Sequence, residues 1–330
     1  METQPQAAAR MYDERAANYE DSWHPDYSRR LMERVPLKPN DRVLVPCCGT
    51  GLESFIAADM VGSDGLVVGV DISTKMLQGA RARQAREPEL GSRIKLIYHD
   101  AMSLDTCAEL QDLRGTFDFL ICSCAFVLCG DPAAVVRAWR PWLKDGGRMV
   151  IDITHEKNLI QGVLMEKVAE NLGLKWPSNR QWIRNSDSFR HILEEEGMVV
   201  ESVELLDNIT GKPVSTFGAE DADAQFEYTV NWLLAGTFSW EGKEERARDL
   251  FREEWENIAC GGRIEIVDWL YLRQSRDYIE GEPSMICSNQ HGESAIPKSS
   301  AICETFRNFK LSSEYLSRRI TTTALTGLRR

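Results

Sequence analysis

The run from Asp41 to Gly51, DRVLVPCCGTG, limits the possible folds more than any other stretch of the chain. Residues 43–45 have the character of a buried strand, and the chain then turns through Gly49 and Gly51. A helix-like run, LESFIAA, follows at once from Leu52. A strand, a glycine turn and a helix N-terminus allow the backbone to approach a nucleotide-like ligand closely. The stretch therefore predicts an α/β fold with a ligand at this turn.

Short apolar runs alternate with helical stretches after this turn. Near-continuous apolar strands separated by helices indicate a parallel, doubly wound sheet that is covered on both faces. The predicted strands are 43–45, 66–70, 94–98, 117–122 and 148–153, and the predicted helices are 52–61, 74–86, 105–113 and 132–143. The run KDGG at 144–147 predicts a turn before the fifth strand.

The second half of the chain completes a predicted sheet of seven strands. The expected elements are helices at 158–172 and 186–196, a sixth strand at 198–206, a helix at 241–258 and a seventh strand at 263–273. The loop-rich stretch 209–226 and the helix after it form an insertion between strands six and seven. Its aromatic residues either wall an apolar pocket or, as is commoner at helical spacing, form a core; they are Phe226, Tyr228, Trp232, Phe238 and Trp240.

The N-terminal region offers one helical face. Residues 1–10 are expected to lack structure, and 11–20 place Tyr12, Ala16 and Tyr19 on one face of a helix. This helix either packs on the domain or acts as a lid whose Tyr19 reaches a ligand. A second helix is expected at 26–34.

Composition excludes several classes of protein. The net charge of -12 argues against a surface that neutralises nucleic-acid phosphates. Nine scattered cysteines fit reduced intracellular thiols better than a disulfide framework, and the cluster Cys122, Cys124 and Cys129 fits core packing better than a metal site. No secretory signal is visible, and the longest apolar stretch, 117–129, is too short to cross a bilayer. We therefore expect a cytoplasmic protein without membrane insertion, nucleic-acid partner or metal.

Polar residues follow the ends of successive predicted strands. In an open α/β sheet the ligand lies outside these ends. Asp71 comes 20 residues after Gly51, a spacing that suits a carboxylate that binds ribose hydroxyls. At the third strand end, Asp100 can accept from an adenine amino group while Met102 packs on the ring. Each acid alone is more often a turn or helix-cap residue, but the combination predicts a nucleotide-type cofactor.

These motifs carry a family resemblance. The runs VLVPCCGTG, VVGVDISTKML, HDAMSL, FDFLICSCAFVL and WLKDGGRMVIDI resemble class I S-adenosylmethionine-dependent methyltransferases, and among them the ubiquinone and menaquinone C-methyltransferase group. The opening YDERAANYE is similar to that group's N-terminal helix, which favours the lid role for Tyr19. The resemblance implies a Rossmann-like methyltransferase fold, with strands six and seven as a β-hairpin at the sheet edge, and S-adenosyl-L-methionine as cofactor.

The resemblance also implies roles for individual residues. Cys47, Gly49 and Gly51 would approach the methionine part of the cofactor, and Asp71 would hold the ribose. Around the adenine and the sulfonium methyl, the implied contacts are Ile72, Met76, Asp100, Ala101, Met102, Ser123, Cys124 and Phe126. On this basis the chain divides into lid helices at 1–40, a cofactor-binding core at 41–155, a remainder with a substrate-capping insertion at 156–280, and a weakly ordered tail at 281–330.

Two residues depart from the family pattern. The family usually has an acid in place of Val45 and a glycine in place of Cys47. A Val45→Asp, Cys47→Gly double substitution is therefore expected to tighten cofactor binding.

The expected function is methyl transfer to O, N, C or S of a small, apolar or aromatic metabolite. The enzyme's main task is to place the acceptor in line with the methyl carbon, and a base is needed only if the acceptor must lose a proton. The first candidates for this base are His155 and Glu156, after strand five, and His24 is next. A structural role for His155 as the first residue of a helix fits the sequence equally well. Two alternatives stay open: a protein that binds the cofactor without transferring methyl, and an NAD(P)-dependent oxidoreductase. The oxidoreductase would require a third glycine, where the chain has only Ser54.

Overall fold

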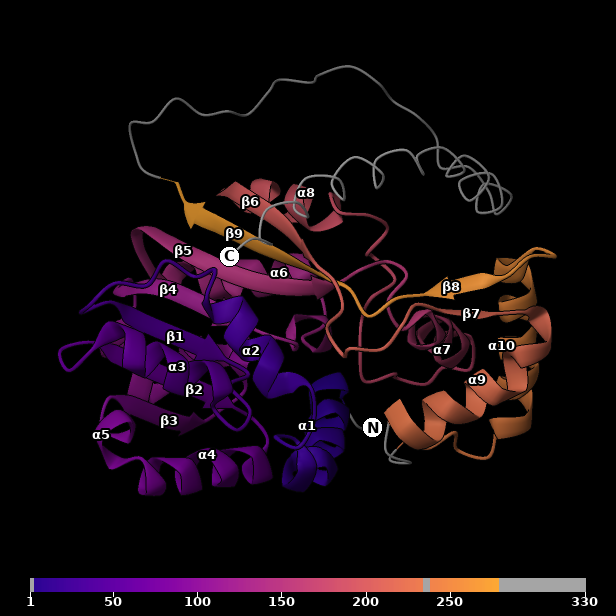
Figure 1. Cartoon of the computed structure of the whole chain (residues 1–330), viewed down its shortest axis with the longest axis horizontal. Coiled ribbons are helices and arrows are strands. Elements are labelled where there is room, and N and C mark those ends of the chain that lie inside the picture. Colours follow the sequence, from indigo (N-terminus) through magenta and orange to yellow (C-terminus); the bar gives the residue numbers. More distant parts are fainter. Residues whose placement is uncertain (1–2, 234–237, 279–330) are drawn as a thin grey trace, which may run out of the picture.

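One seven-stranded sheet organises the chain. The structure is a computed structural model that describes residues 3–233 and 238–278 (Figure 1). The strand order in the large sheet is β3-β2-β1-β4-β5-β9-β6, and β7 and β8 form a second, two-stranded sheet. The strands are β1 Arg42–Pro46, β2 Leu66–Asp71, β3 Ile94–Tyr98, β4 Phe117–Cys122, β5 Leu143–Thr154, β6 Met198–Leu206, β7 Ser215–Phe217, β8 Ile264–Ile266 and β9 Leu270–Asp277.

The pairing is parallel from β3 to β5 and antiparallel at one edge. β1 pairs in parallel with β2 and β4, and the pairs β2–β3 and β4–β5 are also parallel. β9 runs antiparallel to both of its neighbours, β5 and β6. This confirms the predicted fold: a mostly parallel, doubly wound sheet of seven strands with an antiparallel edge pair and a helical insertion between its two strands.

Helices cover both faces of the sheet because alternate strand residues point to opposite sides and both sets are apolar. Val43 and Val45 pack in a buried cluster with side chains of α2 and α3, whereas Leu44 packs in a second cluster with α6 and α8. The α-helices are α1 Gln4–Arg15, α2 His24–Met32, α3 Leu52–Val61, α4 Thr74–Arg86, α5 Pro88–Gly91, α6 Pro132–Trp139, α7 Ile160–Asn171, α8 Ser188–Glu195, α9 Ala222–Tyr228 and α10 Glu244–Ala259.

The insertion and α7 form a lobe with its own core. Figure 1 shows α7, α9, α10, β7 and β8 gathered at one end of the molecule, with α1 at the junction between this lobe and the large sheet. Phe226, Phe238 and Trp240 pack in the lobe core, whereas Tyr228 is 38% exposed. The aromatic residues of the insertion are therefore mainly core, and the side chain of Trp232 lies outside the described part.

Two predictions about the chain's course are wrong. Helix α1 begins at Gln4, within the segment expected to lack structure, because Thr3 and Gln6 form a capping box and Ala7 and Ala8 are buried good helix formers. The predicted seventh strand, 263–273, is two strands, because the chain crosses there from the lobe to the large sheet. At the crossing, Val267 N donates to Lys157 O at 3.2 Å.

Smaller differences concern turns. The KDGG run lies within β5 as an irregularity in its pairing with β4, rather than before it. The loop-rich stretch 209–226 contains β7 and most of α9. None of the described helices is long and apolar enough to span a membrane. The predicted tail at 281–330 lies outside the described residues.

Candidate active site

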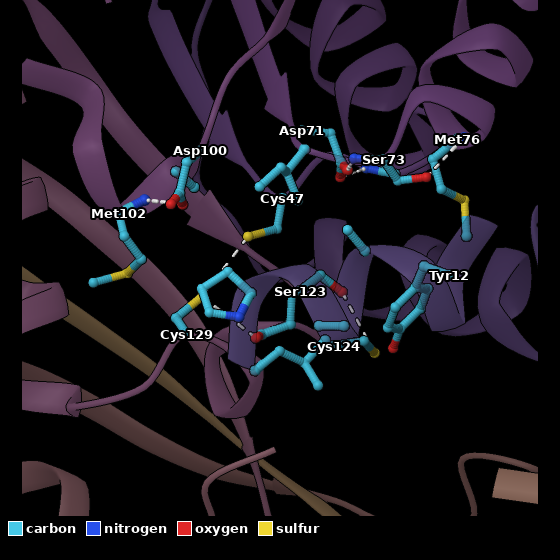
Figure 2. A pocket seen from close by; sticks show the side chains of 18 of the residues that line it. Tyr12, Cys47, Asp71, Ser73, Met76, Asp100, Met102, Ser123, Cys124 and Cys129 are labelled. Carbon is cyan, nitrogen blue, oxygen red and sulfur yellow. Dashed lines mark hydrogen bonds between the residues drawn. The ribbon is translucent and has the colours of Figure 1, made fainter. Parts of the chain in front are cut away.

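A pocket lies where β1, β2, β3 and β4 end, and α1 covers it. Parallel strands bring their C-terminal ends to one edge, so residues from distant parts of the sequence meet there. Figure 2 shows Asp100 and Met102 at one side of this pocket and Tyr12, Ser73 and Met76 at the other. The lining residues are Pro5, Ala8, Ala9, Tyr12, Tyr19, Cys47, Gly49, Asp71, Ile72, Ser73, Met76, Asp100, Ala101, Met102, Ser123, Cys124, Ala125, Leu128 and Cys129.

The turn after β1 is built from left-handed backbone. Cys47, Gly49 and Gly51 have φ of 56°, 54° and 86°, a region that glycine enters without a Cβ penalty. Gly51 caps α3, and its N–H donates to Cys48 O at 2.8 Å, which closes the turn. Cys48 is buried on the α3 side of the sheet, whereas Cys47 lines the pocket.

Asp71, the last residue of β2, organises this turn. Its carboxylate accepts from Gly49 N and from Ser73 N, both at 2.7 Å. Burial, together with the neighbouring Cys47, raises the pKa of Asp71 to about 7, although the backbone donors act in the opposite direction. Each carboxylate oxygen has a second lone pair, so the acid can hold the turn and still accept from a ligand diol.

Asp100 stands at the corresponding place after β3. Its Oδ1 accepts from Met102 N at 2.9 Å, which starts the short 3-10 turn that follows. Ala101 is fixed from behind, because its carbonyl accepts from the Trp139 indole N–H at 2.8 Å. The two predicted acids are thus brought to one pocket on rigid supports.

The N-terminal region closes the pocket with two tyrosines. Tyr12 of α1 and Tyr19 both line it and pack edge to face at 6.2 Å. Asp13 ties α1 to the start of α4, since it accepts from the Ser73 hydroxyl at 2.5 Å and from Lys75 N at 3.2 Å. The sequence identified Tyr12 only as a member of a helix face. Its helical spacing from Ala8, which also lines the pocket, is the signal that could have assigned Tyr12 to the pocket.

The predicted bases lie outside the pocket lining. His24 is stacked between Trp23 and Tyr19, with ring centroids 3.9 and 4.1 Å away, and burial lowers its pKa to about 3. It is therefore neutral at pH 7 and supports Tyr19 from behind. His155 is stacked on Tyr271 at 5.0 Å, and Glu156 accepts from the Tyr271 hydroxyl at 2.9 Å.

Two further predicted residues are not part of the lining either. Phe126 is buried against Trp139, Trp182 and Phe189, because the turn after β4 directs its side chain into the core. Ala125, Leu128 and Cys129 line the pocket in its place. Gly51 acts through the α3 cap rather than at the pocket wall.

A buried polar cluster behind Ser123 and Cys124 was missed from sequence. Asp152 of β5 accepts from the Tyr27 hydroxyl at 2.6 Å and from Cys124 N at 2.8 Å. Burial raises its pKa to about 6. The sequence signal for this cluster was the single acid in the apolar run MVIDI. This acid, Asp152, holds the turn after β4 in place through its bond from Cys124 N.

The structure separates Val45 and Cys47, the two residues at which the sequence departs from the family pattern. Val45 is 1% exposed and packs among apolar residues on the α2–α3 side of the sheet, so it does not face the pocket. An aspartate there would be buried without an evident partner. Cys47, by contrast, faces the pocket. Only the Cys47 half of the double substitution therefore tests the site.

The electrostatic character of the pocket is acidic. Asp71 and Asp100 face it, and none of the described residues that line it is Lys or Arg. Tyrosine rings and the sulfur atoms of Met76 and Met102 add polarisable surface. Among the described residues, no group of three or more His, Cys, Asp or Glu is arranged to hold a metal ion. Such a pocket suits a ligand with a positive charge and hydroxyl groups.

Comparison with known proteins agrees with this geometry. Residues 37–197 match a family model described as a methyltransferase domain. The demethylmenaquinone methyltransferases of Oceanobacillus iheyensis and Symbiobacterium thermophilum are 27% and 29% identical over 137 and 163 residues. These matches cover 42% and 45% of this chain and 54% and 59% of the two relatives, so the chain spans little more than half their length.

Residues 37–197 are thus similar to a methyltransferase domain, and the chain resembles class I methyltransferases. Its fold also resembles the crystal structure of the YcgJ protein of Bacillus subtilis, with a TM-score of 0.51 and 15% identity over 78% of this chain and all of that one. The parallel pairing of β1, β2 and β3 is the reason why the glycine turn, Asp71 and Asp100 meet at one sheet edge.

Proposed function

We propose that the chain binds S-adenosyl-L-methionine in this pocket and transfers its methyl group to O, N, C or S of a small, apolar or aromatic metabolite. The observation that carries the proposal is the pocket itself: two acids at successive strand ends, a glycine turn, and no Lys or Arg among the described residues that line it. The cofactor is a cation with a ribose diol and an adenine, and these are the groups that such a lining recognises.

The residues present fit the cofactor. Asp71 would hold the ribose hydroxyls, and Asp100 with Ala101 would read the adenine edge. Ile72, Met76 and Met102 would pack on the ring. Cys47, Gly49, Ser123 and Cys124 would surround the methionine end, with Tyr12 and Tyr19 as cover.

The bound cofactor supplies an electrophilic methyl group on a positively charged sulfur. The chain's contribution is then to align the acceptor atom about 3–3.5 Å from that carbon and to exclude water. No His is among the described residues that line the pocket. An acceptor that is already nucleophilic fits this lining best, and the roles of His155, Glu156 and His24 as bases remain predictions.

The residues that cover the pocket support a class of substrate. Pro5, Ala8 and Ala9 of α1 and Leu128 present an apolar surface to the pocket. An apolar or aromatic acceptor would bury surface against them at about 25 cal/mol per Å². The composition supports action in the cytoplasm on a small molecule rather than on nucleic acid.

A second candidate function is cofactor binding without methyl transfer. Cys47 favours it, because a side chain occupies the pocket wall where the family usually has glycine. An NAD(P)-dependent oxidoreductase is disfavoured, since a pyrophosphate would face two carboxylates, and the described part of the lining supplies no Lys or Arg to balance its charge.

Calorimetry and turnover separate these functions. We expect S-adenosylmethionine and its demethylated product to bind to the wild type and to bind at least about tenfold more weakly to Asp71→Ala. Methyl transfer to any member of a panel of apolar amines, phenols, thiols and quinols supports the enzyme. Binding without turnover on that panel favours the second candidate, and tight binding of NADH instead of S-adenosylmethionine would overturn both.

A further inference from the structure

Three thiols from three different elements meet at the pocket wall. Cys47 comes from the turn after β1, Cys122 ends β4, and Cys129 follows the short 3-10 turn at 126–128. Cys47 and Cys129 are 82 residues apart in sequence, yet their Sγ atoms are 3.8 Å apart (Figure 2). Both line the pocket, whereas Cys122 is fully buried behind them. The fold thus places a pair of thiols directly in the wall of the proposed cofactor site.

The backbone of Cys47 is held in an unfavourable conformation. Its φ of 56° lies in the left-handed region, where the Cβ of an L-residue meets a steric penalty that glycine does not have. A side chain retained at such a position at a ligand site is a reason to look for a function in that side chain.

Two thiols stand beside the Cys47 sulfur and act on its pKa. Hydrogen bonds from Cys122 and Cys129 hold the pKa of Cys47 well below its ordinary value, while the pKa of each of these two donors is raised. Burial and Asp100 act on the pKa of Cys47 in the opposite direction. The geometry places the most accessible sulfur of the cluster, that of Cys47, 3.8 Å from the second thiol of Cys129. The thiolate is the form that attacks electrophiles. Cys47 lines the pocket and is half-buried, whereas Cys122 and Cys129 are buried, so a solute in the pocket meets the Cys47 sulfur first.

We propose that Cys47 and Cys129 form a peroxide-reactive thiol pair that closes a disulfide in the pocket wall and thereby blocks the cofactor. The blocking part rests on the proposed function; the thiol chemistry does not. Cys47 is the attacking thiol and Cys129 the resolving one.

The reaction takes two steps. The Cys47 thiolate attacks one oxygen of a hydroperoxide, so that an S–O bond forms, the O–O bond breaks, and alkoxide, or hydroxide from hydrogen peroxide, leaves. The Cys129 sulfur then attacks the Cys47 sulfenic acid: the S–S bond forms, the S–O bond breaks, and hydroxide leaves with the Cys129 proton as water. Two thiols lose two electrons and one peroxide is reduced.

Closing the disulfide changes the shape of the pocket. The two sulfurs must approach from 3.8 Å to about 2.05 Å, which requires movement of Cys129 or Cys47. Cys129 is next to Leu128, whose carbonyl accepts from Gln4 Nε2 of α1 at 3.0 Å. Movement of the turn toward Cys47 therefore displaces both Leu128 and the start of the covering helix.

The test uses the full chain, first reduced with dithiothreitol and then treated with hydrogen peroxide. Peptide mapping by mass spectrometry without reductant is expected to show a peptide that joins Cys47 to Cys129. Calorimetry of the same sample is expected to show at least about a tenfold loss of S-adenosylmethionine affinity. Dithiothreitol should reverse both changes.

Two variants separate the steps. In Cys129→Ser the resolving thiol is absent, so peroxide should leave a sulfenic acid at Cys47 that dimedone labels, with no cross-link. Cys107→Ser is the matched control, because Cys107 is buried in the core and outside the pocket lining, and it should behave as the wild type.

Three results would overturn the proposal: no joined peptide, a peptide that joins Cys47 to Cys122 instead, or unchanged affinity in protein that carries the cross-link. If the reduced protein does not bind S-adenosylmethionine, the proposed function fails, while the peptide map still decides whether the thiol pair forms.

Discussion

At the scale of single residues, Asp71 couples the pocket to pH. Its pKa of about 7 means that near neutral pH the acid is partly protonated. A folded-state pKa above the ordinary value stabilises the fold at low pH, and this contribution is lost as pH rises from about 4 to about 7. Cofactor binding has the opposite dependence, since an ionised carboxylate is the better acceptor for a diol.

We therefore expect the affinity for S-adenosylmethionine to fall about tenfold between about pH 8 and about pH 6, following the ionised fraction of Asp71. Asp71→Asn should bind more weakly at every pH and show little of this dependence. Calorimetry across the pH range measures both. An unchanged pH dependence in Asp71→Asn would assign it to another group, with Asp152 the next candidate because its pKa is about 6.

The burial of Val45 leads to a prediction about the free energy of unfolding rather than about cofactor binding. Val45 is 1% exposed among apolar neighbours that include Val43 and Ile121. Val45→Asp should lower the free energy of unfolding by about 3 kcal/mol or more, because an unpaired charge is buried. Val45→Ala, which only removes methyl groups, should cost clearly less in the same urea titration. Tighter cofactor binding with unchanged stability in Val45→Asp would contradict the assignment of Val45 to the core.

Among the described residues, Arg273 is a buried cation without a hydrogen-bonded counter-ion. It is fully buried, and none of its three guanidinium nitrogens has a hydrogen-bond partner among the described residues. Its guanidinium lies 5.3 Å from the Tyr271 ring and 5.7 Å from the Phe189 ring. Burial lowers its pKa to about 10, so it stays charged at pH 7.

Arg273→Met should therefore raise the free energy of unfolding by about 1–3 kcal/mol, since an apolar side chain avoids the cost of burying a charge. Arg190→Met, at a half-exposed position of α8, should change it by less than about 0.5 kcal/mol. Chemical denaturation of both variants provides the measurement. Loss of stability in Arg273→Met would mean that the guanidinium has an anionic partner.

At the scale of elements, α1 is the part of the site that covers the pocket. It supplies Tyr12 to the pocket and is held to the start of α4 by Asp13, through the Ser73 hydroxyl and Lys75 N. The large sheet, by contrast, is held by ladder hydrogen bonds and two apolar clusters.

Asp13→Ala should loosen α1 and raise the cofactor dissociation constant about tenfold, through a faster off-rate, with little effect on global unfolding. Glu14→Ala is the matched control, because its pairing with Lys75 is exposed and worth little. Stopped-flow dissociation and hydrogen exchange of α1 report the two effects. Equal off-rates for the two variants would show that the contacts of Asp13 do not hold α1 over the bound cofactor.

At the scale of the whole molecule, the lobe and the large sheet have separate cores. Trp255 is fully buried in the lobe, where its indole N–H donates to Gly218 O at 2.8 Å and its ring stacks on Phe251. Few residues connect the two cores; Met11 of α1 packs in the lobe, and Leu128 packs against both.

Trp255→Ala should cost about 3–5 kcal/mol in the lobe and expose the amides of α10 and β7 to hydrogen exchange, while β1 and β4 stay protected. Tyr228→Ala, at a half-exposed site of the same lobe, should leave the exchange pattern unchanged. Simultaneous loss of protection in lobe and sheet would show that the two cores unfold as one unit.

The sequence by itself determined the sheet and the acids at its edge. Strand, turn and helix N-terminus are local features, and a parallel sheet brings every strand end to one side. Asp71, Asp100 and Gly49 could therefore be assigned to one pocket before any contact was known.

Only the tertiary structure decided how the rest of the chain is placed around that edge. The docking of α1 brought Tyr12 over the pocket, and the turn after β4 brought Cys129 to within 3.8 Å of Cys47 while it directed Phe126 into the core. His155 and Glu156 follow β5, yet they pack on Tyr271 of the antiparallel edge strand. Such placements depend on packing between segments far apart in the sequence, and local patterns carry no information about that distance.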